Sequence, residues 1–310
     1  MAVQLVAELQ KNLQVKLSPS SLLEKSTIAT LAKSIQAMPT DELVLPPSLV
    51  KIQTGNAVRQ PIFLVHPAGG QVYLYRDLAH ELGSEQPVYG FEAPGLDGKV
   101  QPLAQIETMA THYINAMRVV QPEGPYFLGG ASLGGMVAFE MAQQLHALGQ
   151  RIALLFMMDS AGPKQLLLEN TDDLTILAYV LGLGLNPELP ISKEYFDHLD
   201  FEEQARYFFE HSDIANRAYS ENIISHIRNF LEFYKLEIQA MNNYVPKTYP
   251  GQILFFRAHE CDAFMPTHPE NYWKNFATGG VDIHEIQGDH VSMNFPPHVK
   301  MMAEQLKNYL

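Results

Sequence analysis

The sequence predicts an α/β fold, in which a mostly parallel central sheet is flanked by helices and carries a helical insertion. From about residue 50 onward, short apolar runs alternate with amphipathic stretches of helix length, the pattern of parallel strands joined by crossover helices. Most of these runs are apolar almost throughout, as expected of strands buried on both faces. Between about residues 160 and 249 the alternation stops and helical spacing replaces it.

Taken in order, the chain begins with a small helical segment over residues 1–38, followed by a proline-containing linker at 39–48 and a larger domain at 49–310. A structureless segment as long as 160–249 would be unusual, so we expect this insertion to form a helical lid. The predicted strands are Ile62–Val65, Val88–Phe91, Tyr126–Leu128, Ile152–Met158, Gln252–Phe256 and Ile283–Ile286, and the predicted helices are Tyr73–Leu82, Ile106–Val120 and Met136–Leu148.

Composition excludes several classes of function. The 310 residues carry a formal net charge of −13, which argues against nucleic acid as a partner because such binding depends on lysine and arginine. We predict neither a signal peptide nor a membrane-spanning segment from this sequence, and the lone Cys261 fits a reducing compartment. We therefore expect a cytoplasmic, globular protein that has no membrane partner.

The chemistry centres on Ser132. The strand at Tyr126–Leu128 leads into Gly130-Ala131-Ser132-Leu133-Gly134, and a helix follows. This G-x-S-x-G pattern between a strand and a helix is typical of the nucleophile elbow of α/β-hydrolases, in which a sharp turn exposes the serine hydroxyl. The alternative is a glycine-rich turn whose serine only caps the helix, but a cap does not require glycines on both sides.

A second strand end supplies the other part of an oxyanion hole. Ile62–Val65 runs into His66-Pro67-Ala68-Gly69-Gly70, where such hydrolases place one amide donor. We predict that the backbone N–H groups of Ala68 and Leu133 bind the oxyanion, since Pro67 has no N–H. His66, at the end of an early strand, is interpreted as a brace for this loop.

The base is expected near the C-terminus, because the chain order of such sites is serine, acid, histidine. His290 directly follows the last predicted strand, whereas His284 lies within that strand and His298 lies on the final helix. Two residues remain as candidates for the acid that orients His290, namely Asp159 after one strand and Asp262 after the next. Asp289 is adjacent to His290 in sequence and is expected to point away from its ring.

Bound cofactors and metals are not predicted. No histidine and carboxylate group shows a ligand spacing such as H-E-x-x-H, and the glycines around Ser132 do not match a nucleotide-binding pattern. The expected site residues are therefore Ser132 and His290, with either Asp159 or Asp262 as the acid and with the Leu133 and Ala68 amides, and no cofactor or metal ligands are expected.

The chain resembles the thioesterase domains that end modular polyketide and nonribosomal peptide synthetases. The resemblance covers about residues 50–310 and rests on IFLVHPAGG, VYGFEAPGLDG, GPYFLGGASLGGMVAFEMAQQL, LLFMMDS and GDHVSM. In that family the acid commonly follows the strand after the elbow helix, which favours Asp159 over Asp262. The first 38 residues are similar to the latter part of an acyl or peptidyl carrier domain, without its phosphopantetheine-bearing serine.

The resemblance implies a substrate chain held as a thioester on the phosphopantetheine arm of an upstream carrier domain. Ser132 would take the acyl or peptidyl chain, and hydrolysis or macrocyclisation would release it. Two alternatives remain: a stand-alone esterase, lipase or editing (type II) thioesterase, and a non-catalytic interaction module. The sequence does not decide between a polyketide and a peptide substrate.

Overall fold

The computed structural model describes residues 45–96, 100–166, 221–261 and 264–310, together with a few isolated positions. The side chains of 221–227 are not part of this description. The chain divides into two compact units, one formed by Met1–Leu167 with Glu237–Leu310 and the other by Leu168–Leu236. The predicted N-terminal segment and most of the predicted lid lie outside the described residues.

The first unit is built on a seven-stranded sheet with the order β1-β3-β2-β4-β5-β6-β7. Every pair is parallel except β1 with β3, so the predicted mostly parallel sheet is confirmed. The strands are β1 (Leu49–Gln53), β2 (Ile62–Val65), β3 (Val88–Phe91), β4 (Tyr126–Ala131), β5 (Ile152–Met158), β6 (Ile253–Ala258) and β7 (Val281–Ile286).

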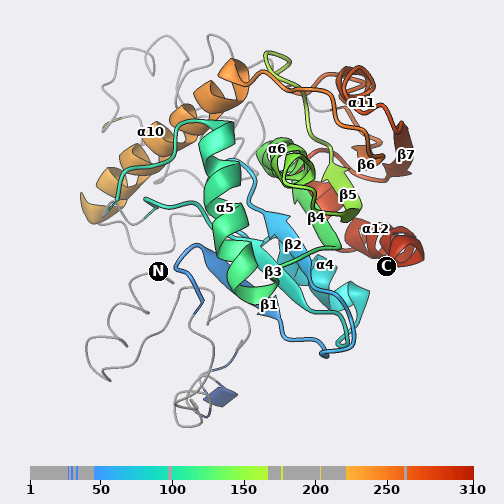
Figure 1. Ribbon diagram of the computed structural model, residues 1–310. Helices are drawn as coiled ribbons and strands as arrows, with labels where there is room; N and C mark the ends of the chain where they lie inside the picture. Colours follow the sequence, from blue (N-terminus) through green and yellow to red (C-terminus); the bar gives the residue numbers. More distant parts are fainter. Residues whose placement is uncertain are drawn as a thin grey trace. The chain divides into compact units, whose positions relative to one another are not determined.

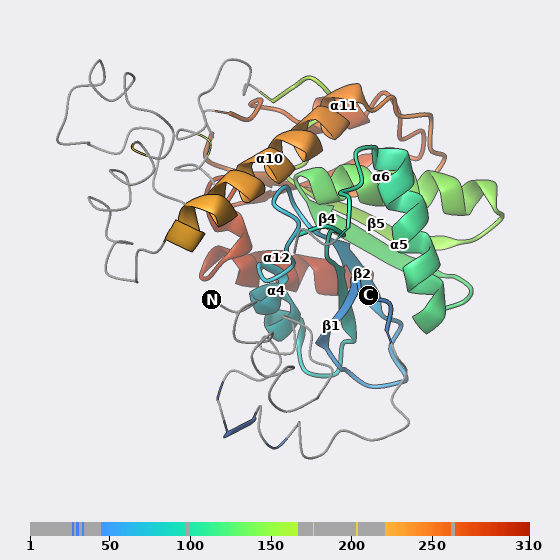
Figure 2. The same cartoon turned by 90° about the vertical axis from the view of Figure 1, so that its left-hand side faces the viewer.

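Alternating side chains of the sheet form two hydrophobic clusters. In β2, for example, Phe63 and Val65 pack on one face, and Ile62 and Leu64 pack on the other, as the two-residue period of a strand requires. The first face is covered by α5 (Ile106–Val120) and α6 (Leu133–Ala147), and the second by α4 (Tyr75–Leu82) and α12 (His298–Leu306). Figures 1 and 2 show this three-layer arrangement.

The remaining described elements are short, with one exception. They are α11 (Glu270–Trp273) and the 3₁₀ turns η2 (Ser292–Asn294) and η3 (Lys307–Tyr309). The exception is α10 (Glu221–Asn243), which begins in the second unit and ends in the first. It covers the C-terminal part of the helical insertion predicted at about 160–249, and most of the rest of that insertion lies outside the described residues.

Several elements differ from the prediction in their bounds: β4 ends at Ala131 rather than Leu128, β6 covers Ile253–Ala258 rather than Gln252–Phe256, β7 begins at Val281 rather than Ile283, and α4 begins at Tyr75 rather than Tyr73. Two further differences have a clear physical reason. β1 is not among the predicted strands because it is an edge strand, antiparallel to its neighbour, with the mixed sequence LVKIQ. Helix α6 begins at Leu133 rather than at Met136. Glycine is a poor helix former, so Gly134 and Gly135 hide the true start of this helix in the sequence.

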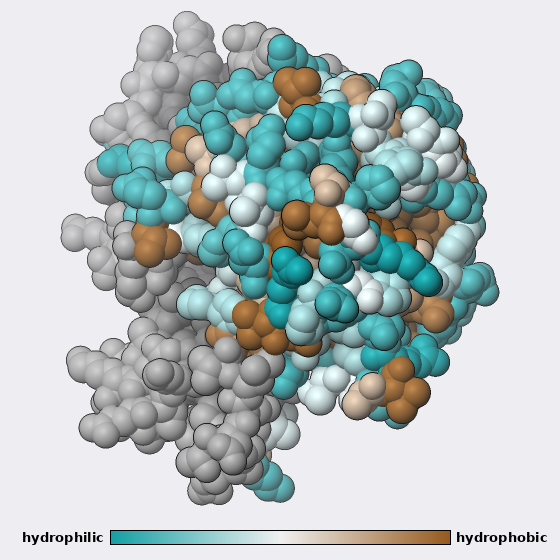
Figure 3. All heavy atoms as spheres, viewed as in Figure 1, coloured by the Kyte–Doolittle hydropathy of each residue, from teal (hydrophilic) through white to brown (hydrophobic). Residues whose placement is uncertain are grey.

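On the described surface, the exposed large apolar side chains lie apart from one another. Exposed large apolar residues such as Val58, Val100, Leu148 and Val245 lie on different segments, and Figure 3 shows brown groups divided by polar ones on the face it displays. Among the helices that the structure describes, none combines the length and the apolar character needed to span a bilayer.

Helix α6 approaches the sheet at glycines. A Cβ atom on Gly134 would lie 2.2 Å from the carbonyl oxygen of Val65 at the end of β2, and one on Gly130 would lie 2.3 Å from the carbonyl carbon of Gly134. Both obstacles are backbone atoms, which cannot rotate away. The first turn of α6 can therefore lie against the ends of β2 and β4 only when these positions have no side chain.

We expect Gly134→Ala to reduce the free energy of unfolding by about 3 kcal/mol, because the added methyl group would overlap backbone atoms in a packed core. Denaturation can be followed through the fluorescence of Trp273, the single tryptophan, which is buried 4.9 Å from the Phe139 ring of α6.

Gly149→Ala is the matched control. Gly149 has a φ of +72° but open space around it, so alanine there costs only the left-handed backbone conformation, roughly 1–2 kcal/mol. Equal losses of stability in the two variants would show that the contact between α6 and β2 relaxes at no cost.

Candidate active site

Ser132 occupies the turn between β4 and α6 in a strained conformation. Its backbone has φ 54° and ψ −121°, which is a rare region for a residue with a side chain. The backbone is fixed there because the Ser132 amide donates to the carbonyl of Met158, at the end of the neighbouring strand β5, over 3.0 Å. The side chain is partly exposed and makes no capping hydrogen bond to α6, so the capping interpretation of this serine is wrong.

Tyr75 of α4 ties the ends of the two central strands together. Its hydroxyl donates to the Val65 carbonyl of β2 and accepts from the Ala131 amide of β4 at 2.9 Å. Burial raises the pKa of Tyr75 above its ordinary value, so the hydroxyl keeps the proton that it donates. In the sequence this residue fits the apolar face of a helix, and no motif marks its bridging contact.

The predicted oxyanion loop forms a tight turn at the end of β2. The Gly70 amide donates to the Pro67 carbonyl at 3.1 Å, and Gly69 has a φ of +102°, which is the pattern of a type II turn with glycine at its third position. A Cβ atom on Gly134 would also lie 2.7 Å from the His66 carbonyl oxygen. The loop that contains Ala68 therefore lies against the first turn of α6, which begins at Leu133.

His66 is fully buried beneath this loop. Its Nδ1 lies 2.8 Å from the Pro67 carbonyl oxygen, and its Nε2 lies 2.7 Å from the Tyr113 hydroxyl. Since a carbonyl oxygen can only accept, Nδ1 carries the proton and Nε2 accepts from Tyr113. Burial lowers the pKa of His66 to about 4, so the neutral ring braces the loop, as the sequence predicts.

The structure brings Asp159 and His290 together. Asp159 directly follows β5, and its Oδ2 accepts from His290 Nδ1 at 2.8 Å, while its Oδ1 accepts from the Ala258 amide at 3.1 Å. The Asp159 side chain is 5% exposed and that of His290 is 12% exposed. Because Nδ1 donates to a carboxylate, Nε2 is the nitrogen that can accept a proton.

Ser132 and Asp159 follow adjacent strands, so the three predicted residues gather at one edge of the sheet. Ser132 comes after β4 and Asp159 after β5, and the β4–β5 register pairs Ala131 with Met158. Within the described chain the Ser132 hydroxyl makes no hydrogen bond, and such bonds commonly tighten only when substrate is bound. The Asp159–His290 contact is thus formed without substrate.

Asp289 organises the loop that carries His290. Its Oδ1 accepts from the Val291 amide at 3.0 Å and from both the amide and the hydroxyl of Ser292, at 2.7 and 2.8 Å. Burial opposes ionisation of Asp289, but these hydrogen bonds outweigh it and lower the pKa of the carboxyl group. These bonds join the Asp289 carboxylate to Val291 and Ser292, in the manner of an Asx turn in which an aspartate oxygen accepts from the amide two residues on. This turn is not among the predictions from the sequence.

The other residues weighed in the sequence lie elsewhere. His284 lies within β7 and bonds to the Tyr309 hydroxyl at 2.9 Å. His298 is the first residue of α12, and Cys261 is exposed. Asp262, the alternative acid, lies outside the described residues.

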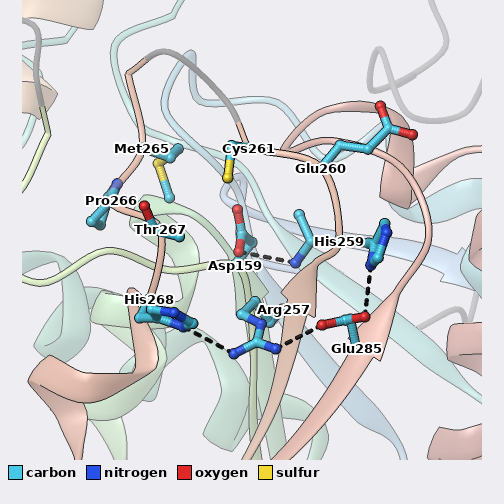
Figure 4. A pocket seen from close by; sticks show the side chains of 11 residues that line it. Asp159, Arg257, His259, Glu260, Cys261, Met265, Pro266, Thr267, His268 and Glu285 are labelled. Carbon is cyan, nitrogen blue, oxygen red and sulfur yellow. Dashed lines mark hydrogen bonds and ion pairs between the residues drawn. The ribbon is translucent and has the colours of Figure 1, made fainter.

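A cavity of about 150 Å³ borders Asp159 on the side of β6 (Figure 4). Arg257 lines this cavity and forms ion pairs with Glu270 at 3.0 Å and with Glu285 at 2.6 Å. Of the three predicted catalytic residues, Asp159 lines this cavity, whereas Ser132 and His290 do not. Over the part of the chain that is described, no group of three histidine, cysteine or acidic residues is arranged to hold a metal ion.

Comparison with known proteins gives two family matches. Residues 60–309 match the model described as "Thioesterase domain", and residues 1–35 match "Phosphopantetheine attachment site". A curated relative, the dimodular nonribosomal peptide synthase of Bacillus subtilis (strain 168), is 33% identical over 99% of this chain. The chain spans 12% of the length of that synthase.

Solved structures show the same fold. A four-domain nonribosomal peptide synthetase bound to AMP and glycine aligns with 99% of this chain and 23% of its own, with a TM-score of 0.71 and 26% identity. The NocB thioesterase domain, in covalent complex with a fluorophosphonate nocardicin G analogue, aligns with 84% of this chain and 98% of its own. Its TM-score is 0.61 and its identity 21%.

Replacing Asp289 with asparagine is expected to lower the free energy of unfolding by about 1 kcal/mol near neutral pH, because hydrogen bonds to a charged acceptor are lost. The folded-state pKa of Asp289 lies below its ordinary value of 3.8. The carboxylate therefore stabilises the fold above that value, and the stabilisation disappears as the pH falls through the lowered pKa.

Denaturant titrations of the wild type and of Asp289→Asn at about pH 7 and about pH 3 would measure this difference. A gap between the two proteins that stays constant with pH would contradict the assignment.

Proposed function

Because this chain belongs to the thioesterase domain family, we propose that it releases an acyl or peptidyl chain from a phosphopantetheine thioester on a carrier domain. The observation that carries the proposal is the strained turn that places Ser132 at the end of β4, next to the strand that leads into Asp159, whose carboxylate is bonded to His290. The match of residues 1–35 to a phosphopantetheine attachment site supports a carrier-bound substrate. It also favours this function over that of a stand-alone esterase or editing thioesterase.

In the first half of the reaction, Ser132 Oγ attacks the thioester carbonyl carbon while His290 Nε2 takes the hydroxyl proton. The carbonyl oxygen becomes an oxyanion, which the Leu133 and Ala68 amides bind. Leu133 is the first residue of α6, so the positive end of the helix dipole also favours this charge. When the C–S bond breaks, the proton on His290 passes to the departing phosphopantetheine thiolate, leaving an acyl group on Ser132.

Asp159 acts on the imidazole rather than on the substrate. Its bond to Nδ1 fixes the tautomer in which Nε2 is basic and stabilises the imidazolium formed after the first proton transfer. The Ala258 amide holds the other carboxylate oxygen, so the carboxylate cannot rotate freely. A small change in the imidazole direction would misplace Nε2 relative to Ser132, which is why both oxygens are fixed.

In the second half, His290 takes a proton from a nucleophile that attacks the acyl carbonyl. Water gives a free acid, whereas a hydroxyl or amine of the chain itself gives a ring. We propose that the insertion around residues 160–249 covers the acyl chain as a lid and thereby controls whether water reaches it. A chain unable to reach back to its own carbonyl would be hydrolysed.

The proposed nucleophile is tested by covalent labelling of the full chain with a fluorophosphonate and by turnover of synthetic acyl phosphopantetheine thioesters. We expect the label on the peptide that contains Ser132, and we expect Ser132→Ala to abolish it and to lower kcat/KM by about 10⁴-fold or more.

Ser160→Ala is the matched control, because Ser160 follows the next strand but is fully buried; it should label like the wild type. A label on any peptide lacking Ser132 would refute the assignment. Turnover of simple esters at the same rate as carrier-bound thioesters would favour an esterase, and an unlabelled, inactive wild type would favour an interaction module.

The acid is tested by comparing Asp159→Asn with Asp262→Asn. Asparagine at 159 would favour the wrong histidine tautomer, so we expect kcat to fall roughly 10²–10⁴-fold, whereas Asp262→Asn should stay within about 3-fold of the wild type. Steady-state kinetics of both variants would decide the assignment, since the opposite ranking would give the role to Asp262.

A further inference from the structure

A buried polar network lies behind the oxyanion loop, and the proposed mechanism does not use it. Glu237, near the end of α10, is 1% exposed, and its Oε2 accepts from the Gly69 amide at 2.7 Å. Its Oε1 lies 3.6 Å from Nδ1 of His66. His66 in turn reaches Tyr113 of α5, whose ring stacks on Phe91 at 5.0 Å between centroids.

The backbone amides of the loop show what this network achieves. The His66 amide donates to the Phe91 carbonyl, the Gly69 amide donates to Glu237, and the Gly70 amide donates to the Pro67 carbonyl. Pro67 has no N–H. Within the described chain the Ala68 amide has no acceptor, so it is the one N–H of this loop that is left for a substrate oxygen.

Two neighbouring glycines make an external anchor necessary. Gly69 and Gly70 have φ values of +102° and +78°, which lets the loop turn sharply but also gives it conformational freedom that a rigid hole cannot tolerate. Gly70 is held on its other side by the bond from the Ala93 amide to its carbonyl, at 2.9 Å. Glu237 supplies the side-chain contact that holds Gly69.

We propose that Glu237 is a positioning residue of the oxyanion hole: by accepting the Gly69 amide, it fixes the Pro67–Gly70 turn so that the Ala68 N–H faces the reacting carbonyl. This inference rests on the proposed function. Glu237 does not touch the substrate, and it acts through the backbone of the loop.

The chemistry of the surroundings fits this role. Burial raises the pKa of Glu237 well above its ordinary value and lowers that of His66 to about 4. Burial therefore disfavours the charged form of both side chains, and it opposes a negative charge on Glu237 behind a site where an oxyanion forms. A carboxyl oxygen still accepts a hydrogen bond when the group is neutral.

The test compares Glu237→Gln, which keeps a neutral acceptor, with Glu237→Leu, which removes it at similar volume. In the full chain, with acyl phosphopantetheine thioesters, Glu237→Leu should lower kcat about 10–100-fold and leave KM within about 3-fold, since an oxyanion donor acts in the transition state. Glu237→Gln should retain kcat within about 3-fold. Hydrogen exchange should show faster exchange of the segment around Gly69 in the leucine variant only.

Glu140→Leu is the matched control for the loss of a buried carboxyl group. Glu140 is 8% exposed, lies on α6 and accepts from the Tyr244 hydroxyl at 2.7 Å. Its side chain also accepts from Gln143 and Gln144, and none of these three partners belongs to the loop. It should lower the thermal midpoint of unfolding but keep kcat within about 3-fold.

The inference is overturned if Glu237→Leu keeps wild-type kcat, if it loses kcat only as much as Glu140→Leu, or if Glu237→Gln does not rescue it. If Glu237→Leu fails to fold, Glu237→Asp is tested instead, because the shorter side chain stretches the hydrogen bond to the Gly69 amide. An unchanged kcat in this variant would overturn the inference. A wild type that neither labels at Ser132 nor turns over would refute the proposed function itself, which is a different outcome.

Discussion

The close approach of α6 to the ends of β2 and β4 is the constraint on which the rest of the site depends. It brings two backbone segments that are distant in sequence, Ser132–Gly134 and His66–Gly70, into contact, and it is possible only because the chain has glycines where the two segments meet. Tyr75 then joins the same two strand ends through one hydroxyl. The strained backbone of Ser132 can persist because these neighbours determine it from several sides.

Asp159 and the buried groups behind the oxyanion loop have different surroundings. Asp159 keeps both oxygens hydrogen-bonded, to His290 and to the Ala258 amide, so its carboxyl group is directed at the imidazole. By contrast, burial lowers the pKa of His66 to about 4 and raises the pKa of Glu237, and so disfavours the charged form of both side chains. The loop proposed to bind an oxyanion offers it amide dipoles, and burial opposes a competing negative charge behind them.

The sequence predicts the elements that depend on a local pattern of residues. It does not predict the contacts between residues that are distant in the chain. Continuous apolar runs predict β2, β3 and β5 with their observed bounds, because strands buried on both faces have little other choice of residue. β1 is not predicted because Lys51 interrupts its short apolar run. The family resemblance is confirmed by the domain match, whereas the contacts of Tyr75 and Glu237 leave no trace in a helical period that is also that of ordinary core residues.

The oxyanion loop and the pair of Asp159 and His290 are held by different parts of the first unit. Glu237 of α10 accepts the Gly69 amide, and the Ala93 amide donates to the Gly70 carbonyl. Asp159 is held instead by the Ala258 amide of β6, and the Asp289 carboxylate organises the loop that carries His290. Because the two sets of contacts share no residue, a change at Glu237 is expected to disturb the loop and to leave the Asp159–His290 bond in place.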